Sequence, residues 1–216
     1  LISHLIAVTA WINMFASYEN VKKKNRFEMK HAFWGPSYDD KTILKSINSK
    51  SLKFKKFSKT EELTNYAAKI IANDKVVGWY QGRSEWGSRA LGNRSILANP
   101  VNKNMKDIIN SKIKKRESFR PFAPSVLEED TNKFFECDIR SEFMNHIIKF
   151  KDEWRDVFPS VCHVDSTARL QTVNRENNPL FYKLISDLKK ITEIAHKINI
   201  IVTVSYTHLR AHETTD

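Results

Sequence analysis

Apolar and polar residues recur along this 216-residue chain with two spacings, which predict an ordered series of helices and strands. Helical spacing of apolar residues predicts helices at 3–19, 40–49, 60–73, 105–114 and from Pro179 onward. Alternation or short β-branched runs predict strands at 52–57, 76–80, 122–127, 161–164 and 198–203. Because helices and strands are mixed and closely spaced, the predicted fold class is α/β with a twisted sheet.

Four of the five glycines fall in one short stretch, GWYQGRSEWGSRALGNRSIL, which begins at Gly78. Glycine serves where the backbone needs a positive φ or where another group approaches closely. The spaced arginines of the same stretch offer planar donor forks suited to phosphate or carboxylate. The stretch therefore predicts a loop system around an anion. Its spacing matches neither the GxGxxG nor the GK[ST] nucleotide-binding pattern.

Positive charge is concentrated in the same region. The chain carries a formal net charge of +11, and ten basic and three acidic residues lie between Arg83 and Arg120. A second basic stretch, NSKIKKRESFRPFAPS, follows the glycines, and a third motif is HVDSTAR. The charge indicates an anionic substrate or polyanionic partner, with a lysine-rich solvated surface as the simpler alternative.

The candidate site residues come from these three motifs. The cations expected to bind substrate or nucleotide are Arg83, Arg89, Lys114, Arg120 and Arg169. The supporting residues are Glu85, Gly87, Gly92, Asn93, Arg94, Ser95, Asn110, His163 and Asp165. Arg94 and Arg116 have acids nearby and are as readily salt-bridged as ligand-bound, Glu85 is better interpreted as orienting an arginine, and a core hydrogen bond is the simpler role for His163.

Other chemistry finds little support in the sequence. Cys137 and Cys162 sit in no CxxC spacing and are expected to be reduced thiols of a cytoplasmic protein. We predict no metal site, including at His208 and His212. No apolar run has the length of a membrane span, and no nucleophile has a plausible paired base.

The stretches GRSEWGSRALGNRSILANP, MKDIINSKIKKRESFRPFAPSVL and HVDSTARLQTVNRENNP resemble the C-terminal region of the NodU/CmcH carbamoyltransferase family, from about residue 26 to about 202. The resemblance implies a YrdC-like domain with a twisted open mixed sheet and flanking helices at 39–203. It also implies a linker at 21–38, and at 1–20 the last helix of a larger ASKHA-type catalytic domain.

The same resemblance implies an O-carbamoyltransferase. The YrdC-like domain would bind carbamoyl phosphate and ATP and form carbamoyl adenylate, with Lys114 and Arg120 as catalytic residues. Arg89 would contact these phosphates, and Arg169 would close the site. The carbamoyl group would then pass to a hydroxyl of a sugar or natural product in the N-terminal domain, which would also hold the metal ion, Fe or Mg.

The alternative is a basic RNA-binding YrdC-like module without transferase activity. Nucleic acid is the less favoured partner because the charge belongs to glycine-rich motifs and is not interleaved with exposed aromatic residues. Two departures from the family pattern matter. Ser88 stands where the family has proline, and residues 204–216 resemble a translated sequencing adapter in place of an Asn-Thr-Ser-Phe-Asn motif. The natural sequence is therefore expected to extend beyond both ends, and the chain alone is expected to be inactive.

Overall fold

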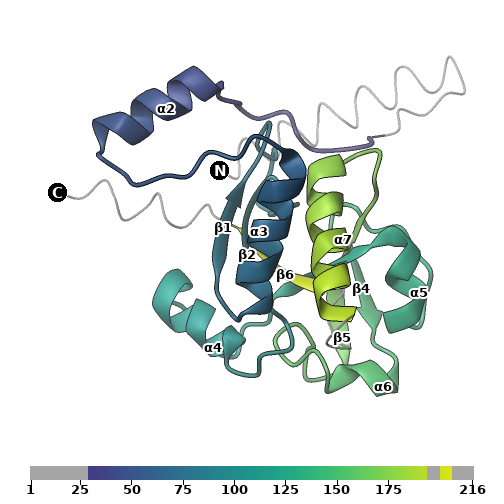
Figure 1. The fold of residues 1–216 in the computed structure, drawn as a ribbon. Helices are drawn as coiled ribbons and strands as arrows, with labels where there is room; N and C mark the ends of the chain where they lie inside the picture. The colour runs from purple at the N-terminus through teal and green to yellow at the C-terminus, as the bar shows by residue number, and fades with distance from the viewer. Residues whose placement is uncertain (1–28, 194–199, 206–216) are drawn as a thin grey trace, which may run out of the picture. The chain divides into compact units, whose positions relative to one another are not determined.

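The computed structural model describes residues 29–193 and 200–205, drawn in colour in Figure 1. Contacts divide the chain into two units, Leu1–Lys30 and His31–Asp216, and the described helices and strands all belong to the second. Its elements, in chain order, are α2 (Asp40–Ser49), α3 (Thr60–Ala72), β1 (Val77–Tyr80), β2 (Arg94–Ala98), α4 (Met105–Ile108), the π-helix η1 (Ile109–Lys114), β3 (Ala123–Leu127), the 3-10 turn η2 (Glu128–Asp130), α5 (Thr131–Phe134), β4 (His146–Lys149), α6 (Asp152–Arg155), β5 (Thr167–Val173), α7 (Pro179–Glu193) and β6 (Ile200–Ser205).

The six strands form one mixed sheet in the order β1-β2-β6-β3-β5-β4. Only β3 and β5 pair in parallel, and the other neighbours are antiparallel. The last described strand, β6, lies between β2 and β3 and joins the two halves of the sheet. The fold is therefore α/β with a mixed sheet.

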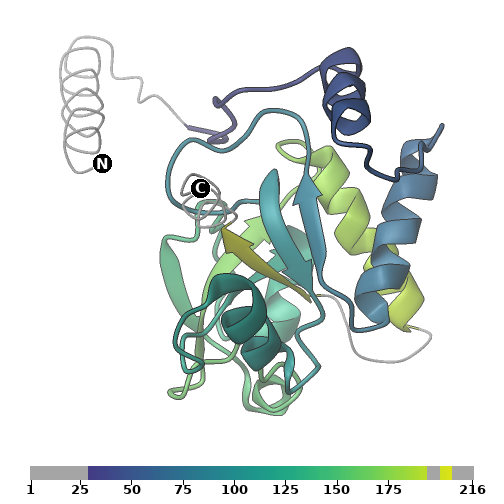
Figure 2. The same cartoon turned by 90° about the vertical axis from the view of Figure 1, so that its left-hand side faces the viewer.

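Each face of the sheet covers its own hydrophobic core. Helices α3 and α7 pack side by side on one face, as Figure 1 shows. Their buried residues meet those of the strands in one cluster, which includes Ala68, Ile71, Leu97, Phe181, Leu184 and Leu188. In Figure 2, α4 and η1 lie on the side of the sheet away from α3 and α7. A second hydrophobic cluster lies on this other face of the sheet and includes Ile96, Met105, Ile109, Phe134, Phe150 and Leu170.

The amphipathic patterns predicted most of the helices and several strands correctly. The structure confirms helices over 40–49, 60–72 and from Pro179, and strands close to 76–80, 122–127 and 198–203. The helix expected over 105–114 is present, but it changes from α to π geometry at Ile109. The helix predicted at 3–19 lies outside the described residues.

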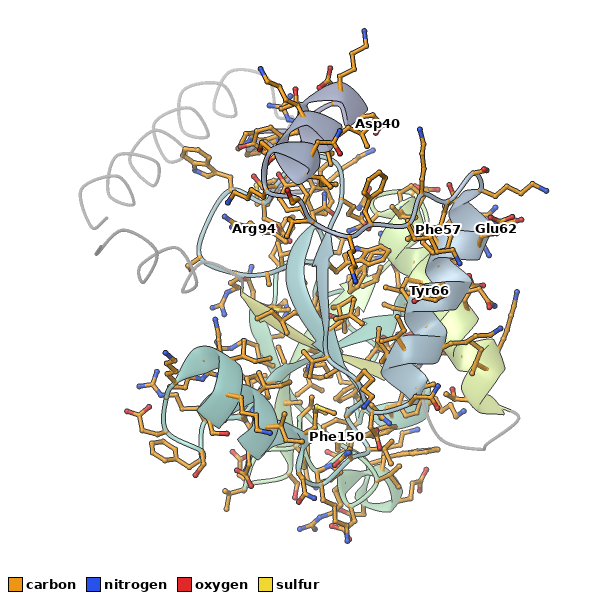
Figure 3. The ribbon with its side chains drawn as sticks, turned by 60° about the vertical axis from the view of Figure 1, so that its left-hand side comes forward. Asp40, Phe57, Glu62, Tyr66, Arg94 and Phe150 are labelled. Atoms are coloured by element: carbon orange, nitrogen blue, oxygen red, sulfur yellow. The ribbon has the colours of Figure 1, made fainter. Side chains whose placement is uncertain are left out.

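Two predicted strands were wrong. Residues 52–57 pair with no described strand, and Leu52 and Phe54 are more than half exposed, while Phe57 contacts Tyr66 on α3 at 5.3 Å between ring centroids (Figure 3). Alternation predicts a strand only where a sheet edge accepts its backbone groups. Residues 161–164 turn instead, because the amide of Val161 donates to the carbonyl of Phe158.

The boundary expected at residue 203 falls inside a strand. Val204 pairs with Ile96, and Ser205 pairs with Ser95, so these two residues continue β6. Strand pairing uses backbone groups and therefore does not depend on the origin of the side chains. Residues 206–216 lie outside the described part of the chain. No helix among the described residues is long and apolar enough to cross a membrane.

Candidate anion-binding site

Strand direction brings the three basic motifs to one end of the sheet. β2 and β3 both run antiparallel to β6, and β5 runs parallel to β3, so β2, β3 and β5 begin at the same end. Each is entered from one motif: the glycine–arginine loop (81–93), the cationic loop (115–122) and the His–Asp turn (163–166). Three segments that are far apart in sequence therefore lie at the same end of the sheet.

The glycine–arginine loop is built around a buried carboxylate. Glu85 is 3% exposed, and its Oε1 accepts hydrogen bonds from the amides of Leu91, Asn93 and Arg94 at 2.7, 2.8 and 3.1 Å. The Nε of Arg94 lies 3.5 Å from Glu85 Oε2, an ion pair without hydrogen-bond geometry. Glu85 therefore orients an arginine and folds the loop, and Arg94, labelled in Figure 3 where the loop enters β2, is salt-bridged.

Side-chain amides attach this loop to the rest of the domain. Gln81 Nε2 donates to Asn93 Oδ1 at 3.0 Å and to Asn178 Oδ1 at 2.7 Å. Asn178 Nδ2 also donates to Asn93 Oδ1, at 3.0 Å. From β5, Gln171 Nε2 donates to the carbonyl of Leu91 at 2.9 Å. Since these groups are buried or half-buried, the network holds the loop in one conformation.

Two of the predicted glycines occupy left-handed backbone positions. Gly87 has φ +117° and open space around it, whereas Gly92 has φ +102° and packs against the ring of Phe181. Beside Gly92, the buried Ser95 accepts from the Gly92 amide through its Oγ at 3.1 Å. These residues shape the loop.

The arginines of this loop divide into two groups. Arg83 binds backbone, because its Nε donates to the carbonyl of Gly35 and its Nη2 to that of Trp34, each at 3.1 Å. Arg89 is half-buried and lies near Arg169 of β5. Burial lowers the pKa of Arg89, and the positive charge of Arg169 lowers it further. The structure thus places Arg89 and Arg169 together, while Arg83 anchors the loop.

The cationic loop is organised by Asn110, which is fully buried in the π-helix η1. Its Nδ2 donates to the carbonyls of Ser118 and Arg120 at 3.2 and 3.0 Å, and its Oδ1 accepts from Arg116 Nε at 2.7 Å. π-helical turns recur at functional sites. One asparagine therefore holds the cationic loop at three of its residues.

Three cations follow one another here: Lys114 ends η1, and Arg116 and Arg120 lie on the loop, with Arg116 in electrostatic reach of the other two. Burial lowers the pKa of Lys114, and the charge of Arg116 adds to the effect. Burial likewise lowers the pKa of Arg116, and Arg120 acts in the same direction. Glu117 pairs with Arg120 at 3.0 Å, but both side chains are exposed and the pair is weak. Close positive charges, two of them half-buried, favour an anionic ligand.

The His–Asp turn holds its polar groups by local hydrogen bonds. His163 Nδ1 lies 3.1 Å from Thr167 Oγ1, and Asp165 Oδ1 accepts from the Thr167 hydroxyl at 2.7 Å. Burial lowers the pKa of His163, Asp165 opposes that effect, and Arg169 reinforces it. Ser166 takes a left-handed conformation, φ +65°, before β5. His163 is thus a half-buried hydrogen-bonding residue within electrostatic reach of Arg169.

A cavity of about 490 Å³ opens next to this turn, lined by Lys103, Arg155, Asp156, Pro159, Cys162, His163 and Ser166. Of the predicted site residues it includes only His163, and it does not join Arg89, Lys114, Arg120 and Arg169. No group of His, Cys, Asp or Glu among the described residues could hold a metal ion.

Several residues that shape the site were not predicted. These are Gln81, Gln171 and Asn178, which hold the glycine–arginine loop. Arg116, considered from the sequence as either salt-bridged or ligand-bound, stacks on Phe122 with 5.0 Å from its guanidinium carbon to the ring centroid. Gln81 and Asn178 are 97 positions apart, and no local pattern relates them. The sequence signal that could have pointed to these residues was composition, since Asn and Gln are frequent in and after the motifs.

A mixed α/β domain with three basic loops at one end of its sheet is the class of protein that these features define. The family model described as "Carbamoyltransferase C-terminus" matches residues 68–206, so the chain belongs to the carbamoyltransferase family and corresponds to its C-terminal region.

Relatives support this membership. The chain is 40% identical over 190 residues to nodulation protein NolO of Bradyrhizobium diazoefficiens, covering 86% of this chain and 34% of the relative. It is 43% identical over 178 residues to nodulation protein NolNO of Sinorhizobium fredii, covering 81% and 26%. Nodulation protein U of Azorhizobium caulinodans is 40% identical over 133 residues, covering 62% and 23%. The chain therefore spans about a third or less of the length of these curated relatives.

Proposed function

We propose that this chain is the C-terminal, YrdC-like part of an O-carbamoyltransferase, preceded by an ASKHA-type catalytic domain. Membership of the carbamoyltransferase family supports the proposal, as does the fraction of the relatives that the chain spans. In this arrangement residues 1–20 end the catalytic domain, 21–38 form a linker, and the YrdC-like domain begins at residue 39.

The domain takes carbamoyl phosphate and ATP and produces carbamoyl adenylate. For the atoms to balance, carbamoyl phosphate loses phosphate to water, and a carbamate oxygen then attacks the α-phosphorus of ATP and displaces pyrophosphate. Both steps bring anions together, so preorganised cations and correct positioning supply most of the catalysis. The reaction uses the ATP of the cytoplasm, where we place the enzyme.

The observation that carries this proposal is the grouping of like charges. Arg169 lies close enough to Arg89 to help lower the pKa of Arg89. In a second group, Arg116 acts in this way on Lys114, and Arg120 acts in this way on Arg116. Grouping cations costs free energy in the empty site, and a bound polyphosphate reverses that cost. We assign phosphate binding to both groups, with Lys114 and Arg120 at the reacting phosphate.

Transfer to the acceptor belongs to the preceding domain. There we place the binding of the hydroxyl acceptor, a sugar or natural product, and of the metal ion, Fe or Mg. The names of these relatives concern nodulation and identify no acceptor.

The test is carbamoyl phosphate-dependent exchange of labelled pyrophosphate into ATP by the full-length protein. Lys114→Ala and Arg120→Ala should each reduce exchange at least ~100-fold, in line with the loss of a charge-stabilising contact. Lys112→Ala is the matched control, because Lys112 is an exposed cation of the same π-helix. Circular dichroism should show the same fold in all variants.

Full exchange in both site variants would refute the assignment of Lys114 and Arg120. Exchange that is independent of carbamoyl phosphate would refute the reaction. If instead the protein bound RNA with a steep salt dependence that carbamoyl phosphate did not alter, the RNA-binding alternative would replace the proposal.

A further inference from the structure

Phe119, in the middle of the cationic loop, is the most exposed aromatic side chain of the described residues, at 72%. Single exposed apolar residues are common on protein surfaces, so exposure alone indicates nothing. Phe122, three residues later, behaves differently: it is 3% exposed, belongs to the core and stacks on Arg116. One phenylalanine of this loop therefore serves the core, and the other does not.

The outward position of Phe119 is fixed by the backbone on both sides of it. Asn110 Nδ2 donates to the carbonyl of Ser118 and also to that of Arg120, the two residues that flank Phe119. The Arg120 amide donates to the carbonyl of Glu117 at 3.3 Å, which closes a turn around the same residue. Since a fully buried amide holds both neighbours, the loop presents Phe119 in a preset place.

The surroundings of Phe119 are cationic. Arg120 is its neighbour in sequence, and Arg116 lies within electrostatic reach of both Arg120 and Lys114. Glu117 is the acid that pairs with Arg120. A fixed aromatic face beside grouped cations suits a ligand that combines a flat ring with several negative charges.

We propose that Phe119 stacks on the base of a nucleotide whose phosphates lie on Lys114, Arg116 and Arg120. The identification of that nucleotide as ATP rests on the proposed function. Base stacking on an aromatic side chain tolerates different bases, because every base presents a π-face. Phe119 is thus a positioning residue that sets the distance between the base and the cations that bind its phosphates.

The experiment compares two ligands on the full-length protein by isothermal titration calorimetry: ATP, which has a base, and tripolyphosphate, which has none. Phe119→Leu keeps an apolar side chain but removes the ring, and should weaken ATP binding about 5- to 150-fold. Tripolyphosphate affinity should stay within roughly twofold of wild type, since the cations are unchanged. Phe119→Trp should restore ATP binding.

The matched control is Phe54→Leu, because Phe54 is 54% exposed outside the three basic loops and should affect neither ligand. Equal weakening of ATP and tripolyphosphate by Phe119→Leu would show that Phe119 only shapes the loop, and would overturn the inference. Unchanged affinity for both ligands would overturn it as well.

This assay contains no carbamoyl phosphate and requires no turnover. Ring-dependent ATP binding without pyrophosphate exchange would therefore refute carbamoyl adenylate formation and leave the stacking role of Phe119 intact. If Phe119→Leu kept both pyrophosphate exchange and unchanged ATP affinity, the stacking role would be refuted and carbamoyl adenylate formation would stand.

Discussion

Among the glycine-to-alanine substitutions in the glycine–arginine loop, Gly92→Ala should destabilise the protein most. A Cβ at this position would lie 2.3 Å from one atom of the Phe181 ring and 2.7 Å from two more. Phe181 is fully buried in the core between the sheet and α7, so its ring cannot move aside without displacing other core residues. The φ of +102° adds backbone strain for any residue with a Cβ.

The magnitude follows from two separable contributions. Overpacking of a tight core costs about 1–3 kcal/mol, and a strained left-handed backbone position costs about 1–3 kcal/mol. Their sum is about 2–6 kcal/mol, which for a chain of this size lowers the midpoint of thermal unfolding by roughly 5–20 °C. The assay is thermal unfolding followed by circular dichroism, with guanidinium unfolding to obtain the free energy.

Gly87→Ala is the control that separates the two contributions. Gly87 has φ +117° but no heavy atom within 4 Å of its added Cβ, so it should show backbone strain alone. Phe181→Leu combined with Gly92→Ala should be less destabilising than the sum of the two single changes, because the smaller side chain makes room for the methyl group. Equal losses for Gly87→Ala and Gly92→Ala, or simple additivity with Phe181→Leu, would refute the steric explanation.

Three further predictions concern the polar groups that support the site. Glu85→Gln should lower the free energy of unfolding by about 1–3 kcal/mol in urea titrations, because the charged acceptor of three amides and the partner of Arg94 is lost; an unchanged value would contradict its organising role. Asn110→Ala should speed amide hydrogen exchange in the cationic loop, because two carbonyls and an arginine lose their partner; unaltered protection there would argue against the clamp. Burial lowers the pKa of His163, so the unfolded chain takes up a proton first and stability should fall as pH drops below about 6.5. His163→Gln should remove that share of the pH dependence, as measured by unfolding at pH 7.5 and 5.5, and an identical pH dependence would disprove it.

The sequence correctly predicted the helices whose buried face is visible in the spacing of neighbouring apolar residues. α3 and α7 follow from apolar residues at helical spacing, which coincide with their buried faces. β5 was missed because Arg169 and Gln171 make the segment look polar, although Gln171 is buried and hydrogen-bonded to Ser125 and Leu91. Such a residue is recognised as part of a strand only once its partners, tens of positions away, are in place.

The motifs also predicted where charge would gather, but not how it would divide. Arg83 and Arg89 look equivalent in sequence, yet Arg83 binds the carbonyls of Trp34 and Gly35, almost 50 positions earlier. Which arginine is used for structure and which is left for a ligand depends on those distant carbonyls. This distinction is a property of the tertiary structure and has no counterpart in the spacing of the motif.

A loop rich in glycine and arginine could bind an anion through its backbone amides or through its side chains. In phosphate-binding loops, successive amides point at the anion and form a concave nest. Here the amides of Leu91, Asn93 and Arg94 all donate to Glu85, so these donors are already used inside the protein. Because a buried carboxylate would also repel an anion placed deep in the loop, we expect an anionic ligand on the outer side, at side chains such as Arg89. The glycines therefore allow the chain to wrap around Glu85. Arg83 binds backbone carbonyls and Arg94 pairs with Glu85, so Arg89 is the arginine of this loop that we assign to the ligand.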